Sequence, residues 1–215
     1  MEESVGLLLL NNRIYTSDSE GTGSIYGESL MEKDGRTYRE WVPWRSKLAA
    51  LLKKETLPFD LRGDVLYLGA AQGTTVSHLS DILRDGSVFA VEFSTTAFRN
   101  LLSLSRKRRN IVPILADAFH PELYASQVPD VFILYQDVSQ KDQLGMFLRN
   151  SRRFLGKGGY GVVMVKSRSI DVTARPEDVF LNFEAGLRRS GFDVLINTEL
   201  SPFQKDHAAL VVRKG

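Results

Sequence analysis

The sequence contains no cysteine. This absence excludes disulfide bonds, thiolate zinc sites and cysteine nucleophiles. Histidine is scarce as well: the three histidines stand far apart, at positions 78, 120 and 207, so we expect no metal site.

Long apolar runs are also absent. No apolar stretch reaches the roughly 20 residues that a membrane-spanning helix needs. The first residues, MEESVGLLLLNNR, are acidic before the leucine run, whereas a secretory signal starts with basic residues and has a longer apolar run. We therefore expect a cytoplasmic protein.

Charge is nearly balanced, but the basic residues are unevenly spread. The 215 residues carry a net charge of only +2. Two basic clusters stand out, at residues 106–109 and at Arg149, Arg152, Arg153 and Lys157. Either cluster alone fits the solvated end of a helix, where cations are favourable. Together they modestly favour a polyanionic partner.

The N-terminal part has the texture of a small β domain. Short alternating segments separated by turn signals predict β-hairpins. These segments are residues 6–10, 13–16 and 37–41. A piece of this size buries little surface alone, so we expect it to pack on the rest through Trp41 and Trp44. We place the domain boundary after residue 44, giving domains 1–44 and 45–215.

From residue 45 onward, apolar runs alternate with helical patterns. This alternation is typical of a parallel sheet covered on both faces. The apolar runs are residues 65–68, 88–91, 111–115, 131–134 and 161–165, and the helical patterns are 75–83, 96–105, 141–154 and 176–188. The last two strands, 193–200 and 208–213, are joined by a loop too short for a crossover helix, so they should be antiparallel. The prediction is an α/β, Rossmann-like sheet with a terminal antiparallel hairpin, an arrangement common in methyltransferases.

The stretch VLYLGAAQGTT, residues 65–75, lies where α/β sheets bind ligands, at the carboxyl end of the first strand. A dinucleotide fingerprint needs a middle glycine, but Ala71 stands between Gly69 and Gly73. No lysine follows Gly73, which excludes a P-loop. The turn suits a ligand that packs on the backbone without a pyrophosphate, or a helix entry that binds nothing.

Three successive strands are each followed by an acid. Glu92 ends the second strand, where nucleotide-binding folds hold a ribose diol. Asp117 follows the third strand, in position for an adenine amino group, and Asp137 follows the fourth. One such acid is usually a loop residue or a helix cap. Three in register favour a nucleoside-binding site.

Together these motifs resemble the fibrillarin family, in particular its archaeal members. The resemblance rests on VLYLGAAQGTT, NIVPILADA, YQDVSQ, GKGGYGVVMVKSRSIDVT, KDHAALVVRK and WRSKL, in order over essentially the whole chain. The Gly/Arg-rich tail of eukaryotic members is absent, which favours an archaeal source.

Fibrillarin is the S-adenosylmethionine-dependent RNA ribose 2′-O-methyltransferase of box C/D guide ribonucleoproteins. The resemblance therefore implies S-adenosylmethionine as cofactor. The implied partners are box C/D guide RNA, target rRNA or tRNA, a Nop-domain scaffold protein and a kink-turn-binding protein.

The resemblance also implies a cofactor site and a catalytic set. The implied cofactor residues are Gly69, Ala70, Gly73, Thr74, Thr75, Glu92, Phe93, Asp117, Ala118, Asp137, Val138 and Gln140. The implied catalytic residues are Lys47, Asp137, Lys166 and His207. Gln136 departs from the family, which usually has glutamate there, and Gln72 replaces a small residue of the turn.

The ribose hydroxyl is weakly acidic, so catalysis must align it, assist its proton loss and stabilise the oxyanion. Lys166 ends the fifth strand, and we expect its amine to meet Asp137. It would act as an electrostatic group or, with a pKa lowered by burial and by Lys47, as a base. Without the resemblance, Lys47 is better explained as an exposed first-turn helix lysine and His207 as a surface turn residue. Residues 167–169 suit either phosphate binding or helix capping.

Two other classes of function share these features. A protein (glutamine) or small-molecule methyltransferase would need the same cofactor residues but not the basic clusters. A ribonucleoprotein subunit that only binds would not need to retain the acids and the four catalytic candidates.

Overall fold

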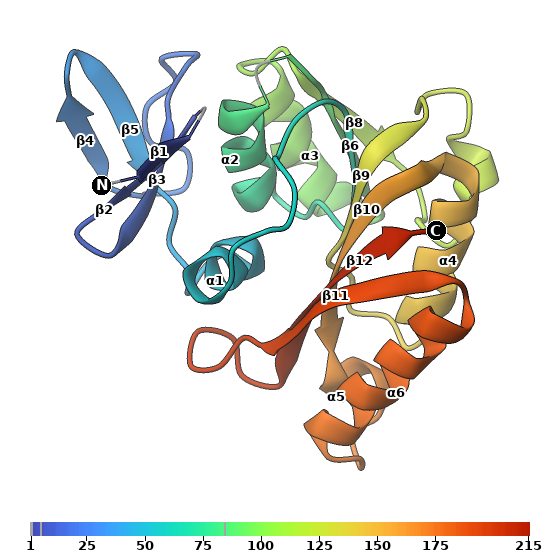
Figure 1. Ribbon diagram of the computed structural model, residues 1–215. Helices are drawn as coiled ribbons and strands as arrows, with labels where there is room; N and C mark the ends of the chain where they lie inside the picture. Colours follow the sequence, from blue (N-terminus) through green and yellow to red (C-terminus); the bar gives the residue numbers. More distant parts are fainter. Residues whose placement is uncertain (1, 5, 84) are drawn as a thin grey trace.

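The computed structural model describes residues 2–4, 6–83 and 85–215. A small N-terminal sheet stands beside a larger α/β body (Figure 1). Within the described residues the small sheet has five antiparallel strands in the order β1-β2-β3-β5-β4. They are β1 (Glu2–Ser4), β2 (Leu7–Leu10), β3 (Arg13–Ser17), β4 (Leu30–Lys33) and β5 (Arg36–Glu40). The three predicted strands are confirmed, and β1 and β4 are additions. The predicted boundary after residue 44 falls between β5 and the first helix and stays a prediction.

The larger sheet has seven strands in the order β11-β12-β10-β9-β6-β7-β8, counted over the described residues. They are β6 (Val65–Leu68), β7 (Val88–Glu92), β8 (Ile111–Leu115), β9 (Val131–Gln136), β10 (Leu155–Lys166), β11 (Phe192–Glu199) and β12 (His207–Lys214). Strands β6 to β10 are parallel, whereas β12 is antiparallel to both β10 and β11. The predicted Rossmann-like sheet with a terminal antiparallel hairpin is therefore confirmed.

Helices cover both faces of this sheet (Figure 1). They are α1 (Lys47–Lys54), α2 (Thr74–Ile82), α3 (Thr95–Ser105), η1 (Pro121–Leu123), α4 (Gln143–Phe154), α5 (Ser167–Ile170) and α6 (Pro176–Arg189). Because side chains of a strand alternate between faces, Tyr67 packs with the α1–α3 cluster and Leu66 with the α4 and α6 cluster. None of the helices in the described ranges combines the length and the apolar character needed to cross a membrane.

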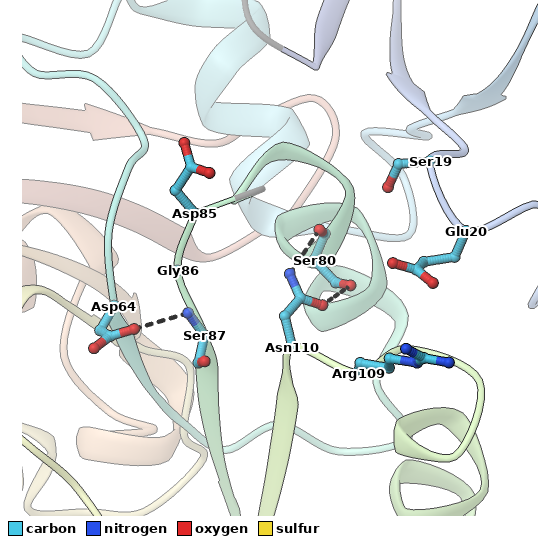
Figure 2. A pocket seen from close by; sticks show the side chains of 9 residues that line it. All are labelled: Ser19, Glu20, Asp64, Ser80, Asp85, Gly86, Ser87, Arg109 and Asn110. Atoms are coloured by element: carbon cyan, nitrogen blue, oxygen red, sulfur yellow. Dashed lines mark hydrogen bonds between the residues drawn. The ribbon is translucent and has the colours of Figure 1, made fainter.

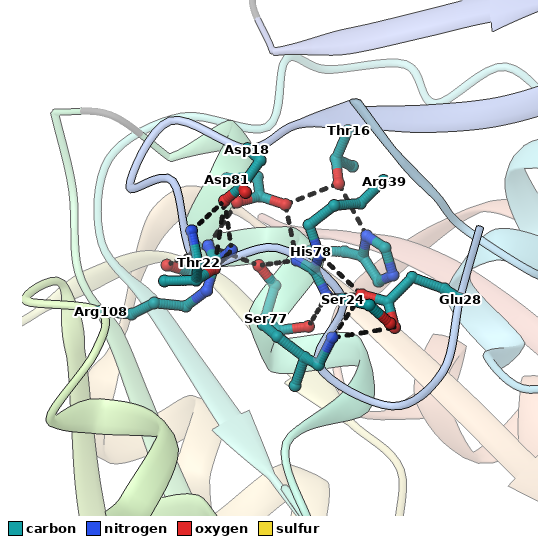
Figure 3. A network of polar contacts seen from close by, with 12 residues as sticks. Thr16, Asp18, Thr22, Ser24, Glu28, Arg39, Ser77, His78, Asp81 and Arg108 are labelled. Atoms are coloured by element: carbon teal, nitrogen blue, oxygen red, sulfur yellow. Dashed lines mark hydrogen bonds and ion pairs between the residues drawn. The ribbon is translucent and has the colours of Figure 1, made fainter. Parts of the chain in front are cut away.

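A buried polar network joins the small sheet to α2 (Figure 3). Asp81 on α2 accepts hydrogen bonds from Arg39 Nη1 on β5 at 2.8 Å and from Thr16 Oγ1 on β3 at 2.7 Å. The guanidinium of Arg108 binds the other oxygen of the same carboxylate. Arg39 also pairs with Glu28 at 2.6 Å, and both of these side chains are fully buried. Buried charges persist only when paired and hydrogen-bonded. The predicted packing of the N-terminal piece on the rest is therefore confirmed, through these charged contacts and through Ile14 and Trp41, which share a core cluster with residues of α2.

Single residues at this interface differ from their predicted roles. Arg108, in the first basic cluster, has a fully buried side chain, so it neutralises Asp81 and cannot meet a polyanion. Trp41 is buried and stacks on His78 with ring centroids 4.9 Å apart, as expected of a residue that joins the two parts. Trp44 is 60% exposed, yet its ring meets that of Phe203, in the loop between β11 and β12, edge to face with centroids 5.2 Å apart, so it joins the two parts at the surface and not in the core.

His78 makes folding depend on pH. Burial lowers its pKa well below the usual 6.5, and the charges of Arg39 and Arg108 lower it further. The unfolded chain binds a proton near pH 6.5 while the folded chain does not, so stability is full above that pH and falls below it. We expect the free energy of unfolding in urea to drop by about 1.4 kcal/mol from roughly pH 7.5 to 5.5 because of this group. The drop should be smaller by that amount in His78→Gln. Equal pH dependence in both proteins would contradict the assignment.

Candidate functional site

The candidate site lies at the carboxyl ends of the parallel strands, where the turn after β6 approaches the end of β9. Gly69 has a φ of +81°, and a Cβ built there would lie 2.2 Å from the carbonyl oxygen of Asp137. The N–H of Asp137 in turn donates to the carbonyl of Leu68 at 2.9 Å. Glycine at position 69 therefore permits the contact that brings the turn and Asp137 together.

Glu92 is held at the mouth of this turn. Its two carboxylate oxygens accept hydrogen bonds from the backbone N–H groups of Ala71 and Ser94, each at 2.7 Å. The ring of the neighbouring Phe93 is 68% exposed. A carboxylate fixed by backbone donors beside an exposed aromatic ring suits a ligand with both hydroxyl groups and a flat ring, such as a nucleoside.

Asp117 and Ala118 lie just beyond β8, at the same edge as Glu92. The carboxylate of Asp117 accepts the N–H of Phe119 at 2.9 Å. Ala118 is buried, and its carbonyl accepts the side-chain amide of Asn150 on α4 at 2.7 Å. This loop is therefore anchored to α4, with an acid held beside the Glu92 position.

A salt bridge joins α1 to the end of β9. Lys47 Nζ lies 2.8 and 2.9 Å from the two carboxylate oxygens of Asp137. Ser46, the N-cap of α1, hydrogen-bonds Thr75 Oγ1 on α2 at 3.0 Å, which ties α1 to the glycine turn. Lys166 was expected to meet Asp137. Among the contacts of the described residues, this carboxylate instead pairs with Lys47.

Lys166 and His207 are partners across the antiparallel pair of β10 and β12. The N–H and C=O of Lys166 both point away from β12, to the side chain of Gln143, at 3.2 Å each. Lys166 and His207 are therefore a non-hydrogen-bonded pair of the antiparallel ladder. In such pairs the two Cα atoms are roughly 4.5 Å apart and the two side chains lie close together. His207 Nδ1 donates to the carbonyl of Lys205 at 2.7 Å, which leaves Nε2 as the acceptor of the neutral ring.

The four proposed catalytic side chains lie within electrostatic reach of one another. Burial lowers the pKa of His207 below its usual 6.5, and the charges of Lys47 and Lys166 lower it further, against the Lys205 carbonyl and Asp137. The imidazole is therefore neutral at pH 7. The structure brings two pairs to one edge: Lys47 with Asp137, and Lys166 with His207.

The remaining predicted cofactor residues surround this edge. Thr74 and Thr75 begin α2, directly after Gly73, whose φ of +92° ends the turn. Val138 and Gln140 lie in the loop between β9 and α4, and Ala70 lies within the glycine turn. Sequence reasoning missed Gln143 and Ser46, because a glutamine or a serine at the start of a helix carries no signal of its distant partner.

No side chain of the segment 167–169 caps α5, and Ser167 is not free to bind phosphate. Ser167 is buried, and its hydroxyl donates to the carbonyl of Asp206 at 3.0 Å. Arg168 Nε lies 3.2 Å from the carboxylate of Asp206. These residues therefore tie α5 to the loop between β11 and β12.

A hollow of about 490 Å³ lies at the other edge of the sheet (Figure 2). Its lining includes Asp64, Ser87 and Asn110, the residues directly before β6, β7 and β8. Its polar groups are partly paired with one another, as in the bond from the Ser87 N–H to Asp64 at 2.8 Å. Ligands of such sheets bind at the carboxyl ends of the strands, so we assign the functional site to the opposite edge.

A doubly wound sheet with an antiparallel last strand, a tight glycine turn and a row of acids at its carboxyl edge defines a Rossmann-like methyltransferase. Comparison with known proteins refines this class. The fibrillarin family model matches residues 7–215. The fibrillarin-like rRNA/tRNA 2′-O-methyltransferase of Methanothermobacter thermautotrophicus is 42% identical over 211 residues, covering 97% of this chain and 94% of that protein.

Solved structures agree. One chain of a fibrillarin/Nop5p complex gives a TM-score of 0.92 at 42% identity, covering 100% of both chains. Aeropyrum pernix fibrillarin, solved with natively bound S-adenosyl-L-methionine, gives a TM-score of 0.86 at 40% identity, covering 96% of this chain and 92% of that one. The chain belongs to the fibrillarin family, which confirms the resemblance seen in its motifs.

Proposed function

We propose that this protein transfers a methyl group from S-adenosylmethionine to the ribose 2′-hydroxyl of rRNA and tRNA within a box C/D guide ribonucleoprotein. The observation that carries the proposal is the convergence of two lysines, an aspartate and a neutral histidine beside the glycine turn. The names of the relatives support the reaction, and the cofactor bound to Aeropyrum pernix fibrillarin supports the methyl donor.

The side chains at the carboxyl edge fit S-adenosylmethionine. Glu92 offers two fixed oxygens for a ribose diol, the exposed ring of Phe93 offers a face for adenine, and Asp117 offers an acceptor for the adenine amino group. Asp137 and the loop 138–140 would line the methionine part. When bound, the cofactor supplies an activated methyl group on a positively charged sulfur.

The protein side chains then act on the weakly acidic hydroxyl. In this proposal the ammonium group of Lys166 orients the hydroxyl and stabilises the charge that develops on its oxygen. Lys47 holds Asp137 through both carboxylate oxygens, which fixes the negative charge beside the two lysines. The proton acceptor is either Nε2 of neutral His207 or the amine of Lys166, and the pH dependence of the rate tests the first assignment.

The proposal includes partners. One fibrillarin of closely similar structure was solved with Nop5p, which supports a Nop-domain scaffold. A kink-turn-binding protein, a box C/D guide RNA and a cytoplasmic location complete the proposal. Because Arg108 is buried, the first basic cluster presents only Arg106, Lys107 and Arg109. The second cluster, Arg149, Arg152, Arg153 and Lys157, is exposed. Contacts between such cations and phosphates carry no sequence information, so in this proposal the guide and scaffold supply the specificity.

The cofactor role of Glu92 is testable on the isolated chain. Glu92→Ala should weaken S-adenosylmethionine binding by roughly 1.5–3 kcal/mol, the usual worth of a hydrogen bond to a charged group. Calorimetry measures the affinity directly. Glu177→Ala, which removes an exposed carboxylate on α6, is the control and should bind normally. Unchanged affinity in Glu92→Ala would remove Glu92 from the ribose role.

Reconstitution tests the function as a whole. The isolated chain should methylate RNA poorly, and the addition of scaffold, kink-turn protein and guide RNA should produce methylation at the guide-paired ribose. Mass mapping of the target RNA locates the methyl group. Guide-directed methylation by the isolated chain, or methylation of a scaffold glutamine without any of the RNA, would contradict the proposal.

Lys166 is the residue whose loss should matter most in the assembled complex. Lys166→Met should cut the single-turnover rate at saturating RNA at least ~100-fold, the lower end for positioned acid–base help. Lys166→Arg should recover part of that loss, since a guanidinium keeps the charge but aims its donors differently. Lys157→Met, an exposed lysine of the same strand, is the matched control and should leave the rate unchanged.

The pH dependence of the same rate identifies the proton acceptor. A His207 acceptor keeps the rate level above about pH 6.5, because its pKa lies below that value. A rate that keeps rising well above that pH would exclude His207 as the acceptor. Normal turnover in Lys166→Met at every pH would end the catalytic assignment.

A further inference from the structure

The pairing of β10 with β9 ends before β10 reaches Lys166. The last paired positions are Gln136 on β9 and Val163 on β10. Strand β9 ends there, whereas β10 continues through Met164 and Val165 to Lys166. The backbone groups of Lys166 that point toward the β9 side therefore need a partner that is not a strand.

Gln143 supplies that partner. Its Nε2 donates to the carbonyl of Lys166 and its Oε1 accepts the N–H of Lys166, both at 3.2 Å. A primary amide bonded in this two-point manner reproduces the hydrogen bonds of one more strand residue. Gln143 is fully buried, and as the first residue of α4 it follows the N-cap Asp142, which accepts the N–H of Gly145 at 2.8 Å. The helix start therefore holds the amide in place.

Gln143 is itself held from the end of β9. The Nε2 of Gln136 donates to the backbone carbonyl of Gln143 at 2.8 Å, and the Gln136 side chain is fully buried. An ionised carboxylate at position 136 has no hydrogen to donate to that carbonyl. A hydrogen-bonded chain therefore runs from the residue before Asp137, through Gln143, to the backbone of Lys166.

We propose that Gln143 is a positioning residue for the methyl-transfer reaction, fixing the backbone of Lys166 relative to Asp137. The inference rests on the proposed function, in which Lys166 acts on the ribose hydroxyl. Without the amide, a buried N–H and a buried C=O lose their partners. The unpaired strand end then shifts, and a misplacement of about 1 Å is enough to lower a rate by roughly 100-fold.

The test compares Gln143→Met, which keeps length and burial without hydrogen bonds, with the unmodified protein in the assembled complex. We expect the single-turnover rate at saturating RNA to fall at least ~10-fold, while the Kd for S-adenosylmethionine stays within about twofold. We also expect the amide of Lys166 to exchange its hydrogen at least ~10-fold faster by NMR, with little change at Val163. An unchanged rate and unchanged exchange would overturn the proposal.

A matched control separates positioning from stability. Asn110 also uses a side-chain amide to hold the backbone, donating to the carbonyls of Ser80 and Leu83 at 3.0 and 2.9 Å, but at the opposite edge of the sheet. Asn110→Leu should lower the melting temperature without slowing turnover. A loss of rate in Asn110→Leu equal to that in Gln143→Met would assign both effects to stability and overturn the proposal.

Gln143→Glu is a second variant. The carboxylate keeps an acceptor for the Lys166 N–H, but it turns an oxygen toward the Lys166 carbonyl and buries an unpaired charge, so its rate should fall at least as far as that of Gln143→Met. If Gln143→Met does not fold, slowed turnover and faster Lys166 exchange in Gln143→Glu support the proposal, and normal values overturn it.

The double variant shows whether Gln143 acts through Lys166. In a Lys166→Met background, Gln143→Met should cause no further loss of rate, because the side chain it positions is already absent. Additive losses would overturn the proposal while leaving Lys166 catalytic. Normal turnover in Lys166→Met alone would instead reject the proposed function of that lysine, so the two failures are distinguishable.

Discussion

The close approach of the turn after β6 to the end of β9 is the constraint on which the site depends. Gly69 allows it, because any side chain there would meet the carbonyl of Asp137. The contact places the Asp137 carboxylate beside the glycine turn, within reach of Lys47 at the start of α1. Helix α1 follows the small N-terminal sheet along the chain, so the same ion pair links the orientation of that sheet to the glycine turn and the proposed cofactor site.

The small sheet is linked to the site by a second route, through α2. Asp81 binds arginines from β5 and from the segment after α3, and the same helix begins at the glycine turn. A buried ion network of this kind adds less to stability than well-packed apolar residues of the same volume would. Apart from the buried Nε of Arg108, which has no hydrogen-bond partner, the donors and acceptors of the two arginines and of Asp81 are paired in this arrangement. The network therefore favours one orientation of the sheet on α2. We infer that the network fixes the direction of α2, and therefore also the position of the turn at Gly73, where α2 begins.

The sequence predicts the parallel strands and the acids at their carboxyl edge, because both are local patterns: continuous apolar runs and the residue that ends each run. It does not predict pairings between distant segments. Lys47 and Asp137 are 90 positions apart in the sequence. Arg108 stands in a run of basic residues that reads as solvent-exposed, and its partner Asp81 on α2 is not predictable from that run. Strand β4, with the sequence LMEK, has too little alternation to be recognised and forms because β5 pairs with it. Trp44 resembles a core residue by type, yet its place after β5 leaves it exposed.

The antiparallel last strand explains how a sheet of this class acquires a histidine at its carboxyl edge. A parallel strand delivers the residues at its end to the carboxyl edge, whereas β12 runs in the opposite direction and delivers its first residue, His207, beside Lys166. The site is thus assembled from two halves, one from α1 and β9 and one from β10 and β12. Because β9 stops short of Lys166, strand pairing alone does not fix the distance between the halves. The amides of Gln136 and Gln143 bridge that gap, so the relative position of the two lysines depends on side-chain hydrogen bonds as well as on the sheet.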